Sequence, residues 1–211
     1  MQNKGYYDFD MDFEAIMIEE GMVDEMFRLQ DLKNRKLFLN ENITQDSVHE
    51  FVKHIMQYNC DDKGIDPAER TPILLYVCSN GGAVDAGFEL IDAIQNSKTP
   101  VYTINLGFQY SMGFLIGLAG HKRYASKNAR FLMHDGSGVV YDSGAKMQDR
   151  LKFDLRVDDR IKEYIMSRSN LTSDEYDAKF RIEWYMFADE AKERGFVDYI
   201  IGIDCDIDEV I

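Results

Sequence analysis

A serine, a histidine and two glycine-bearing turns are spaced along this sequence so that together they could cleave an amide bond. Ser111 lies in GFQYSMG at residues 107–113, directly before an apolar run that carries no charge. A serine hydroxyl attacks well only when a neighbouring base takes its proton, and an imidazole often serves as that base. His134, in ARFLMHDG at residues 129–136, offers the imidazole. The pair predicts acyl transfer through a serine.

The second glycine-bearing turn is SNGG at residues 79–82, which follows an apolar stretch. Glycines allow backbone N–H groups to approach a ligand closely, and such groups stabilise the charge on an oxyanion. Each feature has a plainer interpretation when taken alone. Small residues also permit tight helix-to-strand packing, and a single histidine is more often a hydrogen-bonded core residue than a catalytic base. The features together favour a catalytic site.

The elements predicted around these residues place all of them near strand ends. Apolar strands alternate with amphipathic helices through short links, which is typical of parallel strands joined by right-handed crossovers. Ligands bind at the carboxyl ends of such strands, where both turns and His134 fall. In order, the predicted elements are strand 73–78, helix 84–96, strand 101–106, helix 110–120 and strands 122–125 and 130–133.

The flanking sequence adds further elements on both sides of this alternation. Residues 143–169 predict a long charged helix with a narrow apolar stripe, which either projects and packs against another subunit or lies solvated on the surface. The acidic tail at residues 204–209 is predicted to be mobile. The remaining predictions are helix 23–32, strand 36–39, a helix capped by Thr44 or Asp46, helices 171–180 and 188–194, and strand 196–201.

Length, charge and cysteine usage limit the class of protein. A chain of 211 residues buries one sizeable core, and its formal charge of −14 disfavours nucleic acid and anionic lipid as partners. No apolar run approaches the roughly 20 residues of a membrane span, and the first residues lack a signal-peptide pattern, so we expect a cytoplasmic location. The widely spaced Cys60, Cys78 and Cys205 indicate neither a disulfide framework nor a zinc site.

The order and spacing of the motifs resemble those of the Clp protease proteolytic subunits. Members of that family carry N-S-P-G-G, G-x-A-x-S-M-G and M-I-H-Q-P in this order, where the present chain has SNGG, GFQYSMG and FLMHDG. A fourth stretch, MFADEAKERGFVD at residues 186–198, is similar to the family ending F-L-S-A-x-E-A-x-E-Y-G-L-V-D. The resemblance covers residues 32–201.

The resemblance implies a role for each matching residue. Ser111 would be the nucleophile and His134 the base that takes its proton. The backbone N–H groups of Gly82 and Met112 would form the oxyanion hole.

The acid of the triad stays open between three residues. An ungapped alignment from the fourth motif places Glu183 where the family has its aspartate, and Asp177 and Asp135 are the alternatives. The chain also departs from the family in the cleft, because Asn80 replaces a proline and Asp135-Gly136 replaces Gln-Pro.

The resemblance also implies a fold and an assembly. The fold would be crotonase-like α/β, with stacked parallel strands and helices and with helix 143–169 as a projecting handle. We expect an amino-terminal docking segment with the first helix at residues 1–31, a peptidase domain at 32–201 and an acidic tail at 202–211. Stacked seven-membered rings of identical subunits would meet through the handle helix. A Clp-type AAA+ unfoldase would dock near the amino-terminal segment, and no metal or organic cofactor would be needed.

The expected activity is therefore that of a serine endopeptidase acting on unfolded polypeptide through an acyl-enzyme. One alternative is a weakly active or regulatory subunit that keeps the same scaffold. Another is a crotonase-type acyl-CoA hydratase or isomerase, in which the Ser–His pair would have no role. A viral or ATPase-independent maturation peptidase of the same fold is a narrower variant of the first interpretation.

Overall fold

The computed structural model describes residues 20–136, 143–179 and 181–211, and the chain divides into two compact units, residues 1–36 and 37–211. The first unit contains α2 (Glu20–Lys33), where the sequence predicts a helix over 23–32. Residues 1–19 of the predicted docking segment lie outside the described residues. The predicted domain boundaries near residues 31 and 201 stay predictions.

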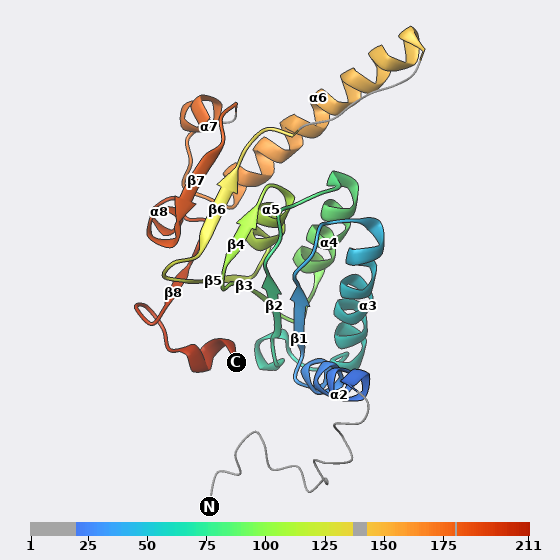
Figure 1. Ribbon diagram of the computed structural model, residues 1–211, viewed down its shortest axis with the longest axis vertical. Helices are drawn as coiled ribbons and strands as arrows, with labels where there is room; N and C mark the ends of the chain where they lie inside the picture. Colours follow the sequence, from blue (N-terminus) through green and yellow to red (C-terminus); the bar gives the residue numbers. More distant parts are fainter. Residues whose placement is uncertain (1–19, 137–142, 180) are drawn as a thin grey trace, which may run out of the picture. The chain divides into compact units, whose positions relative to one another are not determined.

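Five strands form the larger of two sheets (Figure 1). Their order is β1-β2-β3-β5-β8, and β2, β3, β5 and β8 run parallel. Every residue of β2, with the sequence ILLYV, is buried, because large and branched side chains suit a strand that is covered on both faces. The strands are β1 (Lys36–Leu39), β2 (Ile73–Val77), β3 (Val101–Asn105), β5 (Lys122–Ser126) and β8 (Tyr199–Ile201).

The smaller sheet has three strands in the order β4-β6-β7. β4 and β6 run parallel, whereas β6 and β7 run antiparallel. The strands are β4 (Phe108–Tyr110), β6 (Arg130–Met133) and β7 (Trp184–Phe187). This two-sheet arrangement of mainly parallel strands with helices confirms the predicted α/β fold class.

One helix boundary was predicted wrongly. The helix expected over residues 110–120 is α5 (Met112–Leu118), and the residues directly before it belong to β4. Gln109 of β4 pairs with Phe131 of β6, so the backbone there is already bonded into a sheet. The chain therefore makes its sharp turn at Ser111, between the strand and the helix.

Helix α3 (Gln45–Asp61) begins at one of its two predicted caps. The side chain of Thr44 accepts the N–H of Ser47 at 3.1 Å, and the Ser47 hydroxyl accepts the N–H of Thr44 at 2.9 Å. This reciprocal pair satisfies two backbone donors that the first helical turn leaves free. Thr44, rather than Asp46, is therefore the capping residue.

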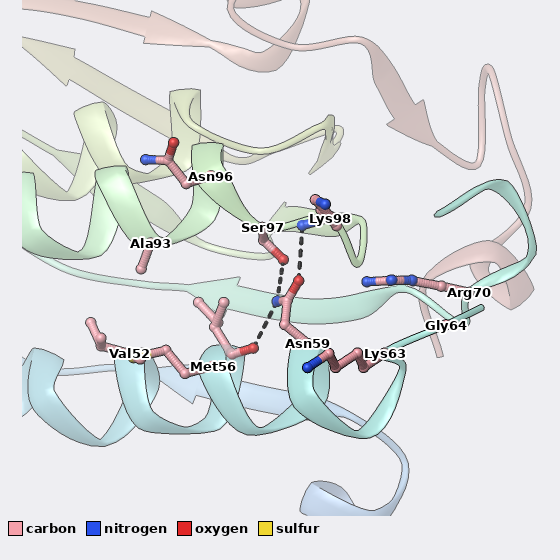
Figure 2. Close-up of a pocket in the computed structure, with 11 residues that line it drawn as sticks. Val52, Met56, Asn59, Lys63, Gly64, Arg70, Ala93, Asn96, Ser97 and Lys98 are labelled. Carbon is pink, nitrogen blue, oxygen red and sulfur yellow. Dashed lines mark hydrogen bonds between the residues drawn. The ribbon is translucent and has the colours of Figure 1, made fainter. Parts of the chain in front are cut away.

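The amide of Asn59 joins the end of α3 to the loop after α4 (Val84–Asn96), as Figure 2 shows. Its Nδ2 donates to Ser97 Oγ at 2.6 Å, and its Oδ1 accepts the N–H groups of Lys98 at 2.9 Å and Thr99 at 3.1 Å. The two helices lie side by side in Figure 1. One side chain thus fixes how α3 meets the entry to β3.

Helix α6 (Gly144–Ser167) confirms the long helix predicted over residues 143–169. Its amino-terminal half extends away from the sheets in Figure 1. Four large apolar side chains on that half are 42–60% exposed: Met147, Leu151, Phe153 and Leu155. Nearer the other end Ile165 is buried. The prediction that this stripe packs against another subunit stays a prediction. The shorter helices that follow are α7 (Ser173–Lys179) and α8 (Ala188–Glu193).

The acidic tail does not have the predicted mobility. Residues Ile207–Val210 form a short 3-10 helix, and Val210 is fully buried in a cluster with Leu74, Tyr76, Ile104 and Tyr124. The Tyr76 hydroxyl also donates to the Val210 carbonyl. A prediction from the acids alone was wrong because Val210, which directly follows them, is buried and anchors the tail. Within the described residues, no helix has the length and apolarity needed to span a lipid bilayer.

Candidate active site

Ser111 lies on a strained turn between β4 and α5. Its φ of 54° and ψ of −123° are unusual for a residue that carries a side chain. Three main-chain hydrogen bonds hold this conformation. The Ser111 N–H donates to the Leu132 carbonyl at 2.9 Å, and its own carbonyl accepts the N–H groups of Phe114 and Leu115 at 3.0 and 3.2 Å. Backbone strain of this kind persists where the surrounding structure imposes it, often at a functional site.

The glycine pair lies directly against this turn. A Cβ atom added to Gly81 would come within 2.8 Å of Ser111 Cβ and 2.9 Å of the Met112 nitrogen. Gly81 also has a φ of 98°, in the region that favours glycine. The sequence SNGG therefore allows the two turns to approach more closely than any side chain would permit.

Two backbone N–H groups at this contact have no acceptor within the described part of the chain. Around Gly82, the Ile43 N–H donates to the Gly81 carbonyl at 2.9 Å, and the Ala83 N–H donates to the Ile43 carbonyl at 2.8 Å. This parallel bridge leaves the N–H of Gly82 on the opposite side of the chain. Met112 is the first residue of α5, so its N–H has no intrahelical partner. Both groups are available to an oxyanion.

Ser111, His134, Gly82 and Met112 line one cavity of about 390 Å³. The structure thus brings together the four residues that the sequence predicts for the nucleophile, the base and the oxyanion hole. His134 follows the last residue of β6 and is half-buried. Among the described residues, no hydrogen bond joins the Ser111 hydroxyl to the His134 ring. Catalytic hydrogen bonds are often long or poorly aligned until substrate binds. The roles of Ser111 as nucleophile and His134 as base stay predictions.

Glu183 directly precedes β7, and His134 directly follows β6. β6 and β7 pair antiparallel, and the ladder ends at Met133 opposite Trp184; continued by one position, this register would set His134 against Glu183. Directly opposed residues have Cβ atoms roughly 4.5–5.5 Å apart. The Glu183 carboxylate is exposed and accepts the Tyr185 hydroxyl at 3.2 Å. It does not line the cavity.

The two alternative acids lie in different surroundings. Asp177, on α7, is exposed and forms an ion pair with Lys162 at 2.6 Å. The Asp177 carboxylate is therefore already paired with the Lys162 ammonium group. Asp135 is exposed and adjacent in sequence to His134. Of the three candidates, Glu183 is therefore the one that the strand register, continued by one position, would set against the histidine.

Helix α6 contributes a wall of the cavity that the sequence analysis did not assign to the site. Asp158, Ile161 and Ile165 line it together with Ser111 and His134. Burial raises the pKa of the Asp158 carboxyl above its usual value, and the nearby acids Asp154, Asp135 and Asp159 raise it further. The three lining residues Asp158, Ile161 and Ile165 are three and four residues apart, so they share one face of α6. In a sequence, only the apolar residues of such a face stand out.

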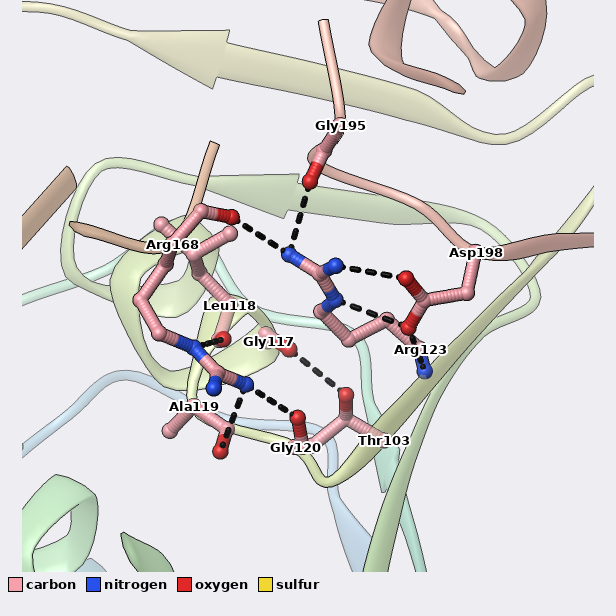
Figure 3. A network of polar contacts seen from close by, with 9 residues as sticks. All are labelled: Thr103, Gly117, Leu118, Ala119, Gly120, Arg123, Arg168, Gly195 and Asp198. Atoms are coloured by element: carbon pink, nitrogen blue, oxygen red, sulfur yellow. Dashed lines mark hydrogen bonds and ion pairs between the residues drawn. The ribbon is translucent and has the colours of Figure 1, made fainter. Parts of the chain in front are cut away.

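An arginine network fixes the carboxyl end of α6 to the carboxyl end of α5 (Figure 3). Arg168 donates to the carbonyls of Leu118, at 3.1 Å, and Gly120. Arg123 in turn donates to the Arg168 carbonyl at 2.7 Å and forms a two-pronged ion pair with Asp198, at 2.9 and 2.5 Å. A cation suits the free carbonyls at a helix end. The network holds the α6 wall beside the helix that starts at Ser111.

A larger cavity of about 520 Å³ lies between α3 and α4 (Figure 2). Its lining includes the three cations Lys63, Arg70 and Lys98 and the hydroxyl of Ser97. That hydroxyl donates to the Thr99 carbonyl at 2.6 Å, and the described residues that line this cavity include no histidine to act as its base. Among the described residues, no group of three or more His, Cys, Asp or Glu side chains could hold a metal ion. The Ser111 cavity is the stronger candidate for chemistry.

Comparison with known proteins identifies the family. The family model described as Clp protease matches residues 19–204. A Bacillus licheniformis protein named ATP-dependent Clp protease proteolytic subunit 2 is 27% identical over 172 residues, which cover 81% of this chain and 87% of the relative. A Tropheryma whipplei protein of the same name is 30% identical over 171 residues, which cover 80% and 92%. A Leifsonia xyli protein named ATP-dependent Clp protease proteolytic subunit 1 is 28% identical over 171 residues, which cover 80% of this chain and 84% of the relative. Because the match extends over most of its length, this chain belongs to the Clp protease family.

Proposed function

We propose that this chain is the serine endopeptidase subunit of a Clp-type protease and hydrolyses unfolded polypeptides. One observation carries the proposal. Ser111 and His134 line the same cavity as the unpaired amides of Gly82 and Met112. This arrangement offers a nucleophile, a base and an anion site within one space. Relatives named as Clp protease proteolytic subunits support polypeptide as the substrate.

The reaction proceeds through an acyl-enzyme. Ser111 Oγ attacks the carbonyl carbon of a peptide bond while His134 takes the hydroxyl proton. The N–H groups of Gly82 and Met112 stabilise the negative charge on the carbonyl oxygen, and losing one such donor typically lowers kcat about 100- to 1000-fold. His134 then gives its proton to the departing amine. It next removes a proton from water, which attacks the ester, releases the carboxylate product and restores the serine.

We assign the third triad position to Glu183. A carboxylate beside the imidazole fixes its tautomer and stabilises the imidazolium that forms in each step. The antiparallel register of β6 and β7 supports Glu183 because the ladder ends at Met133 opposite Trp184, one position before His134 and Glu183. In the structure this carboxylate accepts the Tyr185 hydroxyl at 3.2 Å, so the proposed role requires it to exchange that hydrogen bond for one from the imidazole.

The proposed assembly is a pair of stacked seven-membered rings that works with a Clp-type AAA+ unfoldase. The exposed apolar side chains on the outer half of α6 support a ring-to-ring contact there. The relatives' names describe subunits of an ATP-dependent protease, which supports an ATPase partner. An unfoldase is needed because an extended chain fits a cleft that a folded protein does not enter.

Labelling with a fluorophosphonate probe tests the activity. The probe reacts only with an activated serine, so the wild-type chain should be labelled at Ser111. Ser111→Ala should abolish labelling, and His134→Ala should slow it by at least 100-fold because the hydroxyl loses its base. Cleavage of an unfolded protein such as casein should follow the same order. Labelling that persists in Ser111→Ala would assign the activity to another residue.

A weakly active or regulatory subunit of the same scaffold is the second candidate. It is favoured by the exposed position of Glu183 and by the lack of a hydrogen bond between Ser111 and His134 among the described residues. This candidate predicts that the purified chain reacts with the probe no faster than Ser111→Ala does. Labelling at a rate that depends on His134 would exclude it.

A further inference from the structure

The cavity that holds Ser111 and His134 has one carboxylate in its wall, that of Asp158. This residue lies on α6, which is anchored close by. The Tyr164 hydroxyl donates to the Leu115 carbonyl at 2.9 Å, and Ile165 is buried. The carboxylate is therefore held at a defined place relative to the reacting groups, although the outer half of the same helix is exposed.

Asp158 has no cationic partner among the described residues. It is half-buried, and no ion pair or hydrogen bond of its side chain is present there. The groups that act on it from its own helix, Asp154 and Asp159, and from the end of β6, Asp135, are acids that raise its pKa. Across from it, Tyr176 of α7 is the other titratable group that it influences. The nearest cation on the same face of α6, Lys162, is paired with Asp177 at 2.6 Å, so the half-buried Asp158 carboxylate lacks the partner that usually compensates burial.

The rest of the cavity wall is mainly apolar. The apolar residues that line the same cavity are Val84, Met112, Phe114, Leu115, Met133, Ile161 and Ile165. Within the described residues, the lining carries no lysine or arginine that could neutralise Asp158. An occupant that matches this wall needs a long aliphatic stem and a cation at its tip. Lysine and arginine side chains have that form, because they bury their methylene groups and keep the charged end on a polar partner.

We propose that Asp158 determines specificity and selects lysine or arginine on the acyl side of the cleaved bond. The acyl-side residue supplies the carbonyl that Ser111 attacks, so its side chain is the one that enters the wall beside the nucleophile. The stem lies against Phe114 and Ile161, and the cation reaches the Asp158 carboxylate. This inference rests on the proposed peptidase function and names its preferred substrate class.

Peptide coumarin amides test the preference, because in these substrates the amino acids lie only on the acyl side. Three peptides differ at the residue before the coumarin: lysine, norleucine, which has the same stem without the cation, and glutamate. The wild-type chain should cleave the lysine peptide with a kcat/KM at least about tenfold above that of norleucine, as expected for one hydrogen bond to a charged group. In Asp158→Asn this ratio should fall to about one. Asp158→Lys should prefer glutamate over lysine.

Asp159→Asn is the matched control, since it removes the neighbouring charge from an exposed side chain that does not line the cavity. It should keep the wild-type ratio. A second measurement uses peptide diphenyl phosphonates with the same three side chains and follows the rate at which Ser111 is modified. This readout needs no turnover, so it works for a slow enzyme.

The outcomes separate this inference from the proposed function. Cleavage of the norleucine peptide with a lysine-to-norleucine ratio near one in the wild-type chain overturns the selection by Asp158 and leaves the peptidase assignment intact. A lysine preference that persists in Asp158→Asn also overturns it. Absence of both cleavage and Ser111 modification, with all side chains, overturns the peptidase assignment and this inference together.

Discussion

Two glycines with nearly the same backbone conformation allow the contact at the nucleophile to be tested by one pair of substitutions. Gly81 has a φ of 98° and Gly64 a φ of 97°. A Cβ atom on Gly64 would have nothing within 4 Å, whereas one on Gly81 would lie 2.8–2.9 Å from Ser111 Cβ, the Met112 nitrogen and the Tyr110 carbonyl oxygen. Gly64→Ala therefore measures backbone strain alone, and Gly81→Ala measures strain together with the clash.

The expected magnitudes follow from these contacts. An alanine forced into the left-handed region costs about 1–2 kcal/mol, and the reduced freedom of the unfolded chain returns about 0.4–1 kcal/mol. Gly64→Ala should therefore lower the free energy of unfolding by about 1 kcal/mol. At Gly81 the contacting atoms are mostly backbone and cannot rotate away, so overpacking adds about 1–3 kcal/mol. Gly81→Ala should therefore lower the free energy of unfolding by about 3 kcal/mol in total.

Urea unfolding followed by the fluorescence of Trp184 provides the assay, because this single tryptophan is only 7% exposed. With a slope of about 2–3 kcal/mol per molar urea, Gly81→Ala should shift the midpoint by about 1 M and Gly64→Ala by less than half as much. Protein concentration is held fixed, since any assembly adds to stability. Gly81→Ala should also slow fluorophosphonate labelling of Ser111 by at least 100-fold, because the clash displaces Ser111 and the Met112 amide.

Equal effects of the two substitutions would refute this reasoning. If Gly81→Ala lost no more stability than Gly64→Ala and was labelled at the wild-type rate, the two turns would not be in the contact described above. If Gly81→Ala lost stability but kept wild-type labelling, the contact would stand. The amide of Met112 would then not be an oxyanion donor.

Three further predictions follow from other parts of the structure. Glu183→Gln should lower kcat in a peptidase assay by about 100-fold or more, because an amide holds the wrong imidazole tautomer. Asp177→Asn should retain activity. The opposite ranking of the two variants would assign the triad acid to Asp177. Arg168→Met removes the hydrogen bonds from a charged donor to Leu118 and Gly120 and a longer one, of 3.4 Å, to Ala119; at about 1.5 kcal/mol for each of the first two, it should cost about 3 kcal/mol in urea unfolding. Arg160→Met, exposed on the same helix, should stay within about 0.5 kcal/mol of wild type, and equal losses would contradict the role of the network. Val210→Ala should cost about 2 kcal/mol and lower Tm by about 4–8 °C, whereas an unchanged Tm would show that the tail does not contribute to stability.

The meeting of Ser111 and His134 in one cavity could be predicted from sequence because it follows from topology. Each residue lies at or just beyond the end of a short apolar stretch, and parallel strands bring their carboxyl ends to one edge. The glycines at 81 and 82 add a second signal, since only glycine suits such a close approach. This part of the site depends on backbone arrangement, which hydrophobic patterning reveals.

Side chains contributed by distant elements could not be predicted in the same way. Asp158 is one acid among many on a charged helix, and its burial depends on how α6 is anchored by Arg168. The register that would set Glu183 opposite His134 depends on pairing between strands about fifty positions apart. No local pattern encodes either relation.

Two of the errors of element prediction have a common physical cause. Phe108–Tyr110 is too short to show a strand period, and the apolar run after Ser111 extended the predicted helix backwards over it. In the tail, the run of acids led to the prediction of a mobile segment. Val210 is instead buried against Tyr76 and fixes the conformation of the tail. In both places tertiary pairing outweighs local composition.

The hydrogen bond from the Ser111 N–H to the Leu132 carbonyl ties the turn to β6, the strand that continues into His134. A displacement of that strand carries the hydroxyl and the imidazole in the same direction. The reacting pair is therefore linked through the backbone, and the α6 wall is joined to the same turn through α5. A substitution on the substrate-facing side of α6, such as one at Asp158, changes that wall and leaves the backbone link between the serine and the histidine strand in place.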